Sequence, residues 1–137
     1  IIFCVVNGKM SEGINFGDDM ARAVVMIGLP FANASDCELK EKMNFLEQKH
    51  RDPSVGKEYY EDLCMKAVNQ SIGRAIRHIN DYAAILLVDG RYKRKGIRDK
   101  LPKWMVTELH VPDTYGRSIG LLNQFYKRKM MVTGREE

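Results

Sequence analysis

The fold of this chain is constrained most strongly by three uninterrupted apolar runs, Ile1–Val6, Ala23–Leu29 and Ala83–Val88. Each run has the length of a strand and contains β-branched residues, without the polar alternation of a sheet that faces water on one side. Such runs are typical of parallel strands that helices cover on both faces. Segments with helical patterns separate the second and third runs, so the sequence predicts an α/β domain with a parallel sheet.

We expect this sheet to be incomplete on its N-terminal side. Three strands are fewer than the roughly five or six of an average sheet, and the first run begins at Ile1 without an initiator Met. The 137 residues fit one domain, and 45% hydrophobic with 29% charged residues is the balance of a folded chain. No apolar run reaches about 18 residues, so no membrane partner is expected.

Helices are predicted from caps and apolar stripes. Ser35 and Glu38 form a capping box, which predicts a helix beginning at Asp36. The other predicted elements are a loop over 48–57, a helix over 58–78, a short helix opened by Pro102, an edge strand over 109–111 and a final helix over about 115–131.

Charge is distributed unevenly along the chain. Residues 1–69 contain 8 basic and 11 acidic residues, a net charge of −3, whereas residues 70–137 contain 14 and 7, a net charge of +7. A basic half beside a mildly acidic half suits a face that meets phosphate. An ordinary solvated surface would explain the same charges.

The cysteines indicate buried, reduced thiols. Cys4, Cys37 and Cys64 are odd in number and widely spaced, and none belongs to a C-x-x-C pair. This argues against a disulfide framework and against a zinc or iron–sulfur site built from this segment. The histidines also lack metal-binding spacing, so the sequence predicts no metal site.

The first candidate site is the polar turn after the first apolar run. Lys9, Ser11, Glu12, Gly13 and Asn15 lie in this turn. In an open α/β sheet, ligands bind at the carboxyl ends of the strands. The turn lacks the G-x-x-x-x-G-K-[ST] pattern of a phosphate-binding P-loop. By itself it also fits a plain strand-to-helix turn.

The second candidate site is the polar face of the helix predicted over 58–78. Gln70, Arg74 and Arg77 stand at i, i+4 and i+7, which predicts that their side chains share one face. Gly73 leaves no side chain beside Arg74. A glycine in the middle of a helix makes the helix about 1 kcal/mol less stable than an alanine does. Two neighbouring guanidiniums suit a polyphosphate oxyanion, and they also suit a solvated basic face.

The third candidate is the basic run over 91–100, which has six basic residues and one acidic residue. Arg91, Lys93, Arg94 and Lys95 could contact a nucleic-acid backbone, with Tyr92 available to stack on a base. A solvated surface is the alternative. The preceding Asp89 resembles the end of a Walker B strand only superficially, and we interpret it as a strand-end residue.

Taken together, two segments resemble motifs of a known family. Gly8-Lys9-Met10-Ser11-Glu12-Gly13-Ile14-Asn15-Phe16 resembles motif V of the XPD-like iron–sulfur superfamily 2 DNA helicases. Gln70-Ser71-Ile72-Gly73-Arg74-Ala75-Ile76-Arg77 resembles their motif VI, Q-x-x-G-R-x-x-R. The resemblance covers essentially the whole chain and is strongest to the ChlR-type (chromosome-loss) branch. Other branches usually have Asp where Asn15 stands.

The resemblance implies a RecA-like fold of the P-loop NTPase type, with 1–137 as the carboxy-terminal part of the second helicase motor domain. ATP with Mg²⁺ would bind between this domain and a first motor domain, which would also hold a 4Fe–4S cluster. The implied roles are arginine fingers for Arg74 and Arg77, nucleotide binding or coupling for Gln70, Gly73, Glu12, Gly13 and Asn15, and DNA binding for Lys9, Ser11, Arg91, Lys93, Arg94 and Lys95.

The resemblance also implies a function and partners. The whole protein would unwind DNA with 5′-to-3′ polarity in the nucleus, and this chain would be inactive alone. Its partners would be the first motor domain, single-stranded and forked DNA, and replication or sister-chromatid cohesion factors. The alternative is a basic nucleic-acid-binding α/β module without a motor role.

Overall fold

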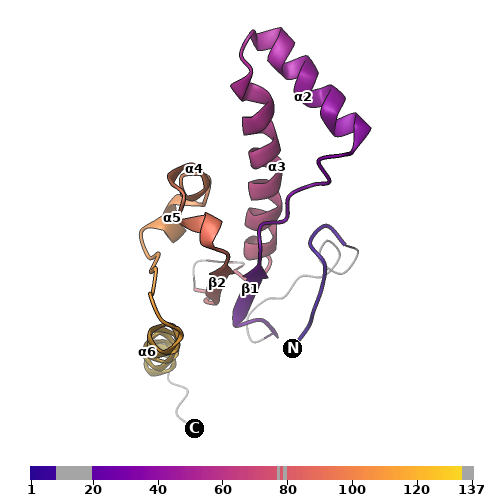
Figure 1. Cartoon of the computed structure of the whole chain (residues 1–137). Helices are drawn as coiled ribbons and strands as arrows, with labels where there is room; N and C mark the ends of the chain where they lie inside the picture. Colours follow the sequence, from indigo (N-terminus) through magenta and orange to yellow (C-terminus); the bar gives the residue numbers. More distant parts are fainter. Residues whose placement is uncertain (9–19, 77, 79, 134–137) are drawn as a thin grey trace.

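The structure is a computed structural model that describes residues 1–8, 20–76, 78 and 80–133. Its elements follow one another along the chain as drawn in Figure 1. They are β1 (Ala23–Ile27), α2 (Cys37–His50), α3 (Ser54–Gly73), β2 (Ala84–Val88), the 3₁₀ helix η2 (Gly90–Lys93), α4 (Lys95–Arg98), α5 (Lys103–Val106) and α6 (Tyr115–Thr133).

The two strands confirm the second and third predicted runs. They pair in parallel, in a register that runs from Ala23 opposite Ala84 to Ile27 opposite Val88. The strand predicted over 1–6 is wrong, because residues 1–5 lie in no helix or strand and their side chains are exposed. A strand forms when its backbone groups pair with the edge of a neighbouring strand. Among the described residues, this run pairs with neither β1 nor β2.

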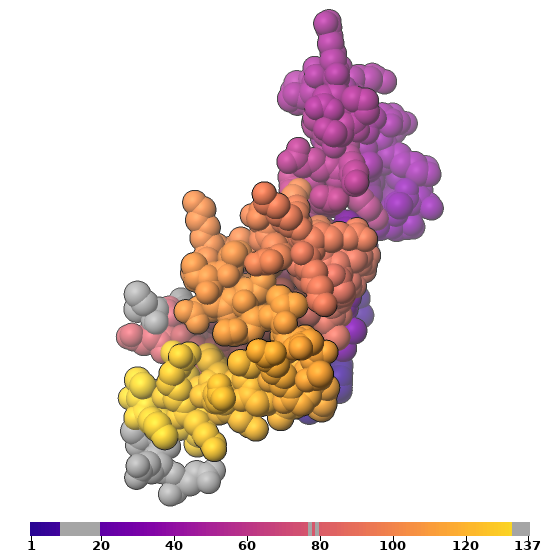
Figure 2. Space-filling view, turned by 60° about the vertical axis from the view of Figure 1, so that its left-hand side comes forward, coloured from indigo at the N-terminus to yellow at the C-terminus, as the bar shows by residue number. Residues whose placement is uncertain are grey.

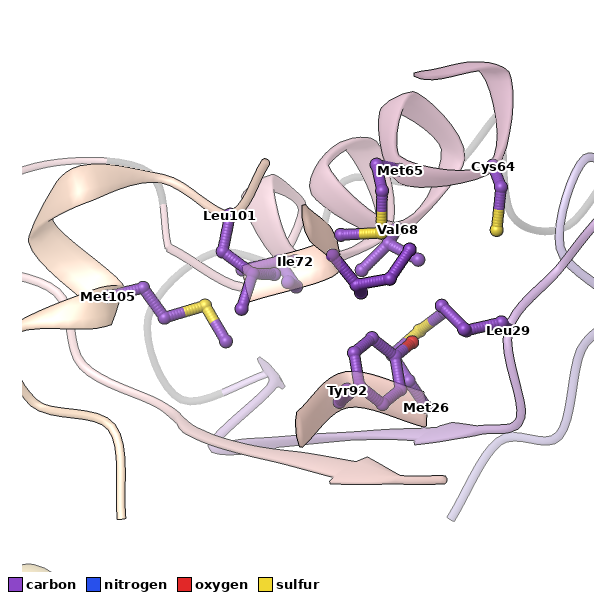
Figure 3. Close-up of a cluster of buried hydrophobic side chains, with 10 residues drawn as sticks. Met26, Leu29, Cys64, Met65, Val68, Ile72, Tyr92, Leu101 and Met105 are labelled. Carbon is purple, nitrogen blue, oxygen red and sulfur yellow. The ribbon is translucent and has the colours of Figure 1, made fainter. Parts of the chain in front are cut away.

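The hydrophobic core lies between α3 and one face of this sheet (Figure 3). Val68 and Ile72 of α3 are fully buried there. The remaining buried members come from β1 and the segments after both strands: Met26, Leu29, Tyr92, Ile97, Leu101 and Met105, with Cys64 and Met65 from α3. On the opposite face of β1, Val25 is 52% exposed and Ile27 is 81% exposed. On this face Ala84 of β2 is buried, so among the described residues the predicted cover is complete on one face and only partial on the other.

Helices α2 and α3 form a hairpin, of which α2 and the start of α3 stand away from the sheet while the carboxy-terminal half of α3 packs on it (Figures 1 and 2). The N-cap of α2 is Asp36, whose side chain accepts a hydrogen bond from the backbone N–H of Leu39 at 2.9 Å. The helix thus begins one residue later than predicted, and Asp36 caps it instead of Ser35.

The loop predicted over 48–57 is too long, because only residues 51–53 lie between the two helices. Gly56, a residue typical of loops, lies in the first turn of α3, where a Cβ would collide with the carboxylate of Glu47 on α2. A side chain at this position would have to displace the Glu47 carboxylate, and the glycine lies within a helix and does not mark a loop here.

Helix α3 ends at Gly73, five residues before its predicted end at His78. The backbone N–H groups of Arg74 and Ala75 bond to the carbonyls of Ser71 and Ile72, three residues earlier. This tightening is typical of a last helical turn. Gly73 is therefore a terminal residue of the helix, and the mid-helix cost argued from sequence does not apply.

The carboxy-terminal third contains the predicted short helix and the predicted final helix. Pro102 stands at the N-cap of α5, and α6 covers the segment predicted over 115–131. The edge strand predicted over 109–111 is wrong, since these residues lie in no strand. No helix within the described ranges is long and apolar enough to cross a membrane.

The cysteine prediction is confirmed for one residue of three. All three thiols are free, and Cys64 is buried in the core. Cys4 and Cys37 are exposed, contrary to the expectation that all are buried.

Candidate functional site

Arg74 lies directly after α3, in the segment that leads to the amino end of β2. It is the C-cap residue, with right-handed helical backbone angles, and it is half-buried. A Cβ added to the neighbouring Gly73 would meet no atom within 4 Å. Gly73 therefore relieves no clash inside the described chain, and the space beside Arg74 is open to a group from outside.

The helix that was predicted to carry Gln70, Arg74 and Arg77 on one face ends earlier than expected, and the stack of all three side chains stays a prediction. Helix α3 stops before Arg74, so helical spacing does not extend from Gln70 through the two arginines. Arg77 lies outside the described residues. Among the motif VI-like residues, the structure places Gln70 and Gly73 in the last turn of α3 and Arg74 at its cap.

Gln70 is exposed and lines two shallow hollows on either side of α3. The smaller, of about 220 Å³, also includes Asn7, Pro30 and Ala32. Asn7 directly precedes the motif V-like segment 8–16. The structure therefore brings the start of this segment next to the start of the motif VI-like segment 70–77. The predicted motif V residues Lys9, Ser11, Glu12, Gly13 and Asn15 themselves lie outside the described residues.

The larger hollow, of about 600 Å³, lies between α3 and the end of the basic run. Its lining includes Lys66 and Asn69 of α3 together with Lys100. The Asn69 amide donates to the Lys100 backbone carbonyl at 3.0 Å. The ammonium of Lys100 forms ion pairs with Glu61 and Asp62. This ion pairing lowers the local positive charge that the sequence predicted for the run.

At the opposite, carboxyl end of the strands, Asp89 holds Arg91. The Asp89 carboxylate accepts a hydrogen bond from the Arg91 backbone N–H at 2.8 Å and from guanidinium Nη2 at 2.7 Å. These hydrogen bonds lower the pKa of Asp89 to about 2. The guanidinium also lies over the Phe31 ring, 5.5 Å from its centroid. Asp89 is thus a strand-end residue, as predicted.

Three basic residues predicted to bind DNA are open to solvent at this end. Lys93, Arg94 and Lys95 are exposed, whereas Arg91 is half-buried against Asp89. The suggestion that Tyr92 stacks on a base is wrong, because its side chain is buried in the core. Its hydroxyl donates to the Gly28 carbonyl at 3.2 Å, and burial raises the pKa of Tyr92 to about 12.

Sequence reasoning missed part of this carboxyl end. Gly28 has a φ of +80° and donates its N–H to the Val88 carbonyl at 3.1 Å, which turns the chain as it leaves β1. Phe31 then lies beneath Arg91. The signal was available, because Gly28 and Pro30 follow an apolar run and such strand ends are where ligands bind in open sheets.

The candidate residues therefore lie in two segments on either side of β2 along the chain. Arg74 belongs to the segment that leads into β2, and the exposed lysines and Arg94 belong to the segment that leaves it. Within the described part of the chain, no three His, Cys, Asp or Glu side chains lie together so as to hold a metal ion.

Comparisons with known proteins show the family of this chain. Residues 1–108 match the helicase C-terminal domain. The chain is 44% identical over 136 residues to the ATP-dependent DNA helicase chl1 of Schizosaccharomyces pombe, covering 96% of this chain and 16% of that protein. It is 50% identical over 133 residues to the ATP-dependent DNA helicase DDX11 of Danio rerio, covering 94% of this chain and 15% of that protein.

A third relative, the ATP-dependent DNA helicase chl-1 of Caenorhabditis elegans, is 49% identical over 127 residues, which are 93% of this chain and 15% of the relative. The chain thus spans about one sixth of the length of the curated relatives it matches. The resemblance to ChlR-type helicases is confirmed, and the parallel sheet with its helices is the described part of a RecA-like fold. The chain belongs to the helicase C-terminal domain family.

Proposed function

We propose that this chain is the carboxy-terminal part of the second motor domain of an ATP-dependent DNA helicase with 5′-to-3′ polarity. Its relatives are named ATP-dependent DNA helicases. In this role Arg74 and Arg77 act as arginine fingers toward ATP bound on a first motor domain. Gln70 and Gly73, with Glu12, Gly13 and Asn15, couple the nucleotide to closure of the cleft.

The observation that carries this proposal is the position of Arg74 beside Gly73. Negative charge spreads over the γ-phosphate oxygens in the transition state of phosphoryl transfer, and a guanidinium delivered from a second domain stabilises it. Arg74 stands where a helix ends, and the backbone next to it faces open space. A nucleotide-bearing surface could approach Gly73 there without meeting a side chain of the described residues.

The exposed sheet face supports a larger domain. Val25 and Ile27 offer apolar surface that a complete RecA-like sheet would cover with further elements. On this proposal the first motor domain carries the Walker A and Walker B motifs and the cysteines of a 4Fe–4S cluster. Mg²⁺ would neutralise phosphate charge there. The isolated chain should accordingly hydrolyse no ATP.

DNA would contact the segment that follows β2. Lys93, Arg94 and Lys95 present exposed positive charge there, and Lys9 and Ser11 would extend the single-strand track. Single-stranded and forked DNA are the proposed substrates. By resemblance to its branch, we place the whole protein in the nucleus, with replication and sister-chromatid cohesion factors as partners.

The test is single-turnover ATP hydrolysis by the full-length protein, with ATP affinity measured in parallel. Arg74→Ala and Arg77→Ala should each slow hydrolysis by about 10³- to 10⁵-fold. ATP affinity should change much less, because the Walker A motif holds most of the nucleotide. Arg74→Lys should rescue poorly, since an ammonium cannot reproduce the planar guanidinium.

Arg117→Ala is the matched control, because Arg117 is a 69% exposed arginine at the start of α6. It should hydrolyse ATP at the wild-type rate. If folded Arg74→Ala and Arg77→Ala both hydrolyse ATP nearly normally, the arginine-finger role is wrong. DNA binding that is independent of nucleotide would then favour a basic nucleic-acid-binding module.

A further inference from the structure

A buried ion pair joins the residue before β1 to the segment before β2. Nη1 of Arg22 lies 2.8 Å from Oδ1 of Asp81 and 3.1 Å from the backbone carbonyl oxygen of Tyr82. The Asp81 side chain is 0% exposed, and that of Arg22 is 26% exposed. The same carboxylate oxygen accepts the Tyr82 backbone N–H at 2.9 Å.

Further contacts hold the pair in place. The Arg22 guanidinium stacks over the Tyr82 ring, 4.1 Å from its centroid. The Arg22 carbonyl accepts hydrogen bonds from the Ala84 backbone N–H at 2.9 Å and from the Tyr126 hydroxyl at 2.7 Å. Burying a carboxylate is costly unless a cation and hydrogen bonds compensate it. Here the geometry supplies both.

Asp81 and Arg74 lie in the same connecting segment, between α3 and β2. The segment that carries Arg74 begins at the end of α3, where Ile72 and Ala75 are buried in the core. The same segment is held at Asp81 and Tyr82 before it enters β2, because the Arg22 guanidinium binds the carboxylate of Asp81 and the backbone carbonyl of Tyr82. The Arg22–Asp81 pair is therefore an anchor of the arginine-bearing segment on its β2 side.

We propose that Arg22 and Asp81 are positioning residues for Arg74. This inference rests on the proposed function, in which Arg74 meets the γ-phosphate. A catalytic guanidinium must be held in place before the cleft closes, because a displacement of about 1 Å can cost about 10²-fold in rate. The pair holds the far end of the segment against β1, so that closure moves Arg74 together with the sheet.

The experiment measures single-turnover ATP hydrolysis and ATP affinity of the full-length helicase. Asp81→Asn keeps the shape of the side chain and removes its charge. We expect hydrolysis to slow by about ten- to hundredfold with little change in ATP affinity. Arg22→Lys should slow hydrolysis less than Asp81→Asn, because its ammonium can still pair with Asp81 but cannot stack on Tyr82 as a planar group.

The matched control is Asp113→Asn, which removes the exposed Asp113–Arg117 ion pair, 3.2 Å long, at the start of α6. Its hydrolysis rate should equal that of the wild type. A second comparison places Asp81→Asn and Arg22→Lys in the Arg74→Ala background. A positioning residue acts through Arg74, so neither change should slow hydrolysis further there.

Two results would overturn the inference. One is wild-type hydrolysis by folded Asp81→Asn or Arg22→Lys, and the other is an equal slowing with and without Arg74. If Asp81→Asn does not fold, the inference is tested by the hydrolysis rate of Arg22→Lys alone and of Arg22→Lys combined with Arg74→Ala. Near-normal hydrolysis by folded Arg74→Ala would instead overturn the proposed function.

Discussion

The Tyr126 hydroxyl donates a 2.7 Å hydrogen bond to the backbone carbonyl of Arg22, which lies 104 positions earlier in the chain. This bond ties α6 to the residue before β1. Phe125, beside it on α6, packs edge-on against the Tyr82 ring with centroids 6.2 Å apart. Helix α6 is thus docked on the same structure that holds the Arg22–Asp81 pair.

Removing the Tyr126 hydroxyl should loosen α6 without displacing the ring. Tyr126→Phe leaves the Arg22 carbonyl with the Ala84 N–H as its other donor, so we expect a loss of about 1 kcal/mol in the local opening free energy. Amide hydrogen exchange in α6 of the full-length protein should accelerate about fivefold. Tyr115→Phe is the control, because Tyr115 is 81% exposed on the same helix. Equal acceleration in both variants would contradict the docking role.

Burial should make one cysteine of this chain unreactive. Desolvation raises the pKa of the Cys64 thiol to about 11, whereas Cys4 and Cys37 are exposed. The thiolate is the reactive form, so at about pH 8 alkylation should modify the two exposed cysteines first. Peptide mass spectrometry of the native full-length protein should find Cys64 unmodified until denaturant is added. Modification of Cys64 at the rate of Cys37 would show that the core opens readily.

The Asp89 carboxylate should contribute stability over a defined pH range. Its pKa is lowered to about 2 by the hydrogen bonds from Arg91, so the folded state favours the ionised form. The contribution is therefore complete above the unfolded pKa of about 4, and it is lost as the pH falls through about 2. Asp89→Asn should lower the melting temperature at about pH 7, and the difference from wild type should shrink below about pH 4.

The control for this prediction is Asp99→Asn, which changes an exposed carboxylate on the same segment, after α4. Its difference in melting temperature from the wild type should be smaller at neutral pH. A gap between Asp89→Asn and wild type that stays constant down to about pH 2 would show that the ionised carboxylate is not the cause.

The apolar patterns in the sequence correctly predicted the helix and the strands that form the core. The runs that became β1 and β2 and the stripe of Val68 and Ile72 on α3 pack against one another, so local pattern and tertiary burial agree. The run over 1–6 is equally apolar, but only its last residue, Val6, packs against this core, and residues 1–5 are exposed. Periodicity reports that a segment is apolar, whereas a strand also requires a neighbouring edge, which the sequence does not reveal.

Local signals were misleading where tertiary contacts decided the outcome. Gly56 is typical of a loop but lies in the first turn of α3, beside the Glu47 side chain of α2. Gly73 stands among helix-forming residues but ends α3. The Arg22–Asp81 pair joins residues 59 positions apart, and no spacing rule reaches across that distance. The motif resemblance identified Arg74, whereas the anchors that hold its segment required the structure.

The exposed basic residues after β2 should bind DNA through its phosphates. Each phosphate that is no longer neutralised should flatten the dependence of log K on log salt by roughly 0.7 for single strands, so replacing Lys93, Arg94 and Lys95 with Gln should lower the slope by roughly 2. Arg91→Gln should change the slope less, because Asp89 already binds that guanidinium. The measurement is binding of single-stranded DNA to the full-length protein at several salt concentrations. Replacing the exposed lysines on the α2–α3 hairpin is the control, namely Lys40, Lys49 and Lys57. Equal slopes for the two triple variants would show that the segment after β2 is an ordinary solvated surface that does not bind DNA phosphates.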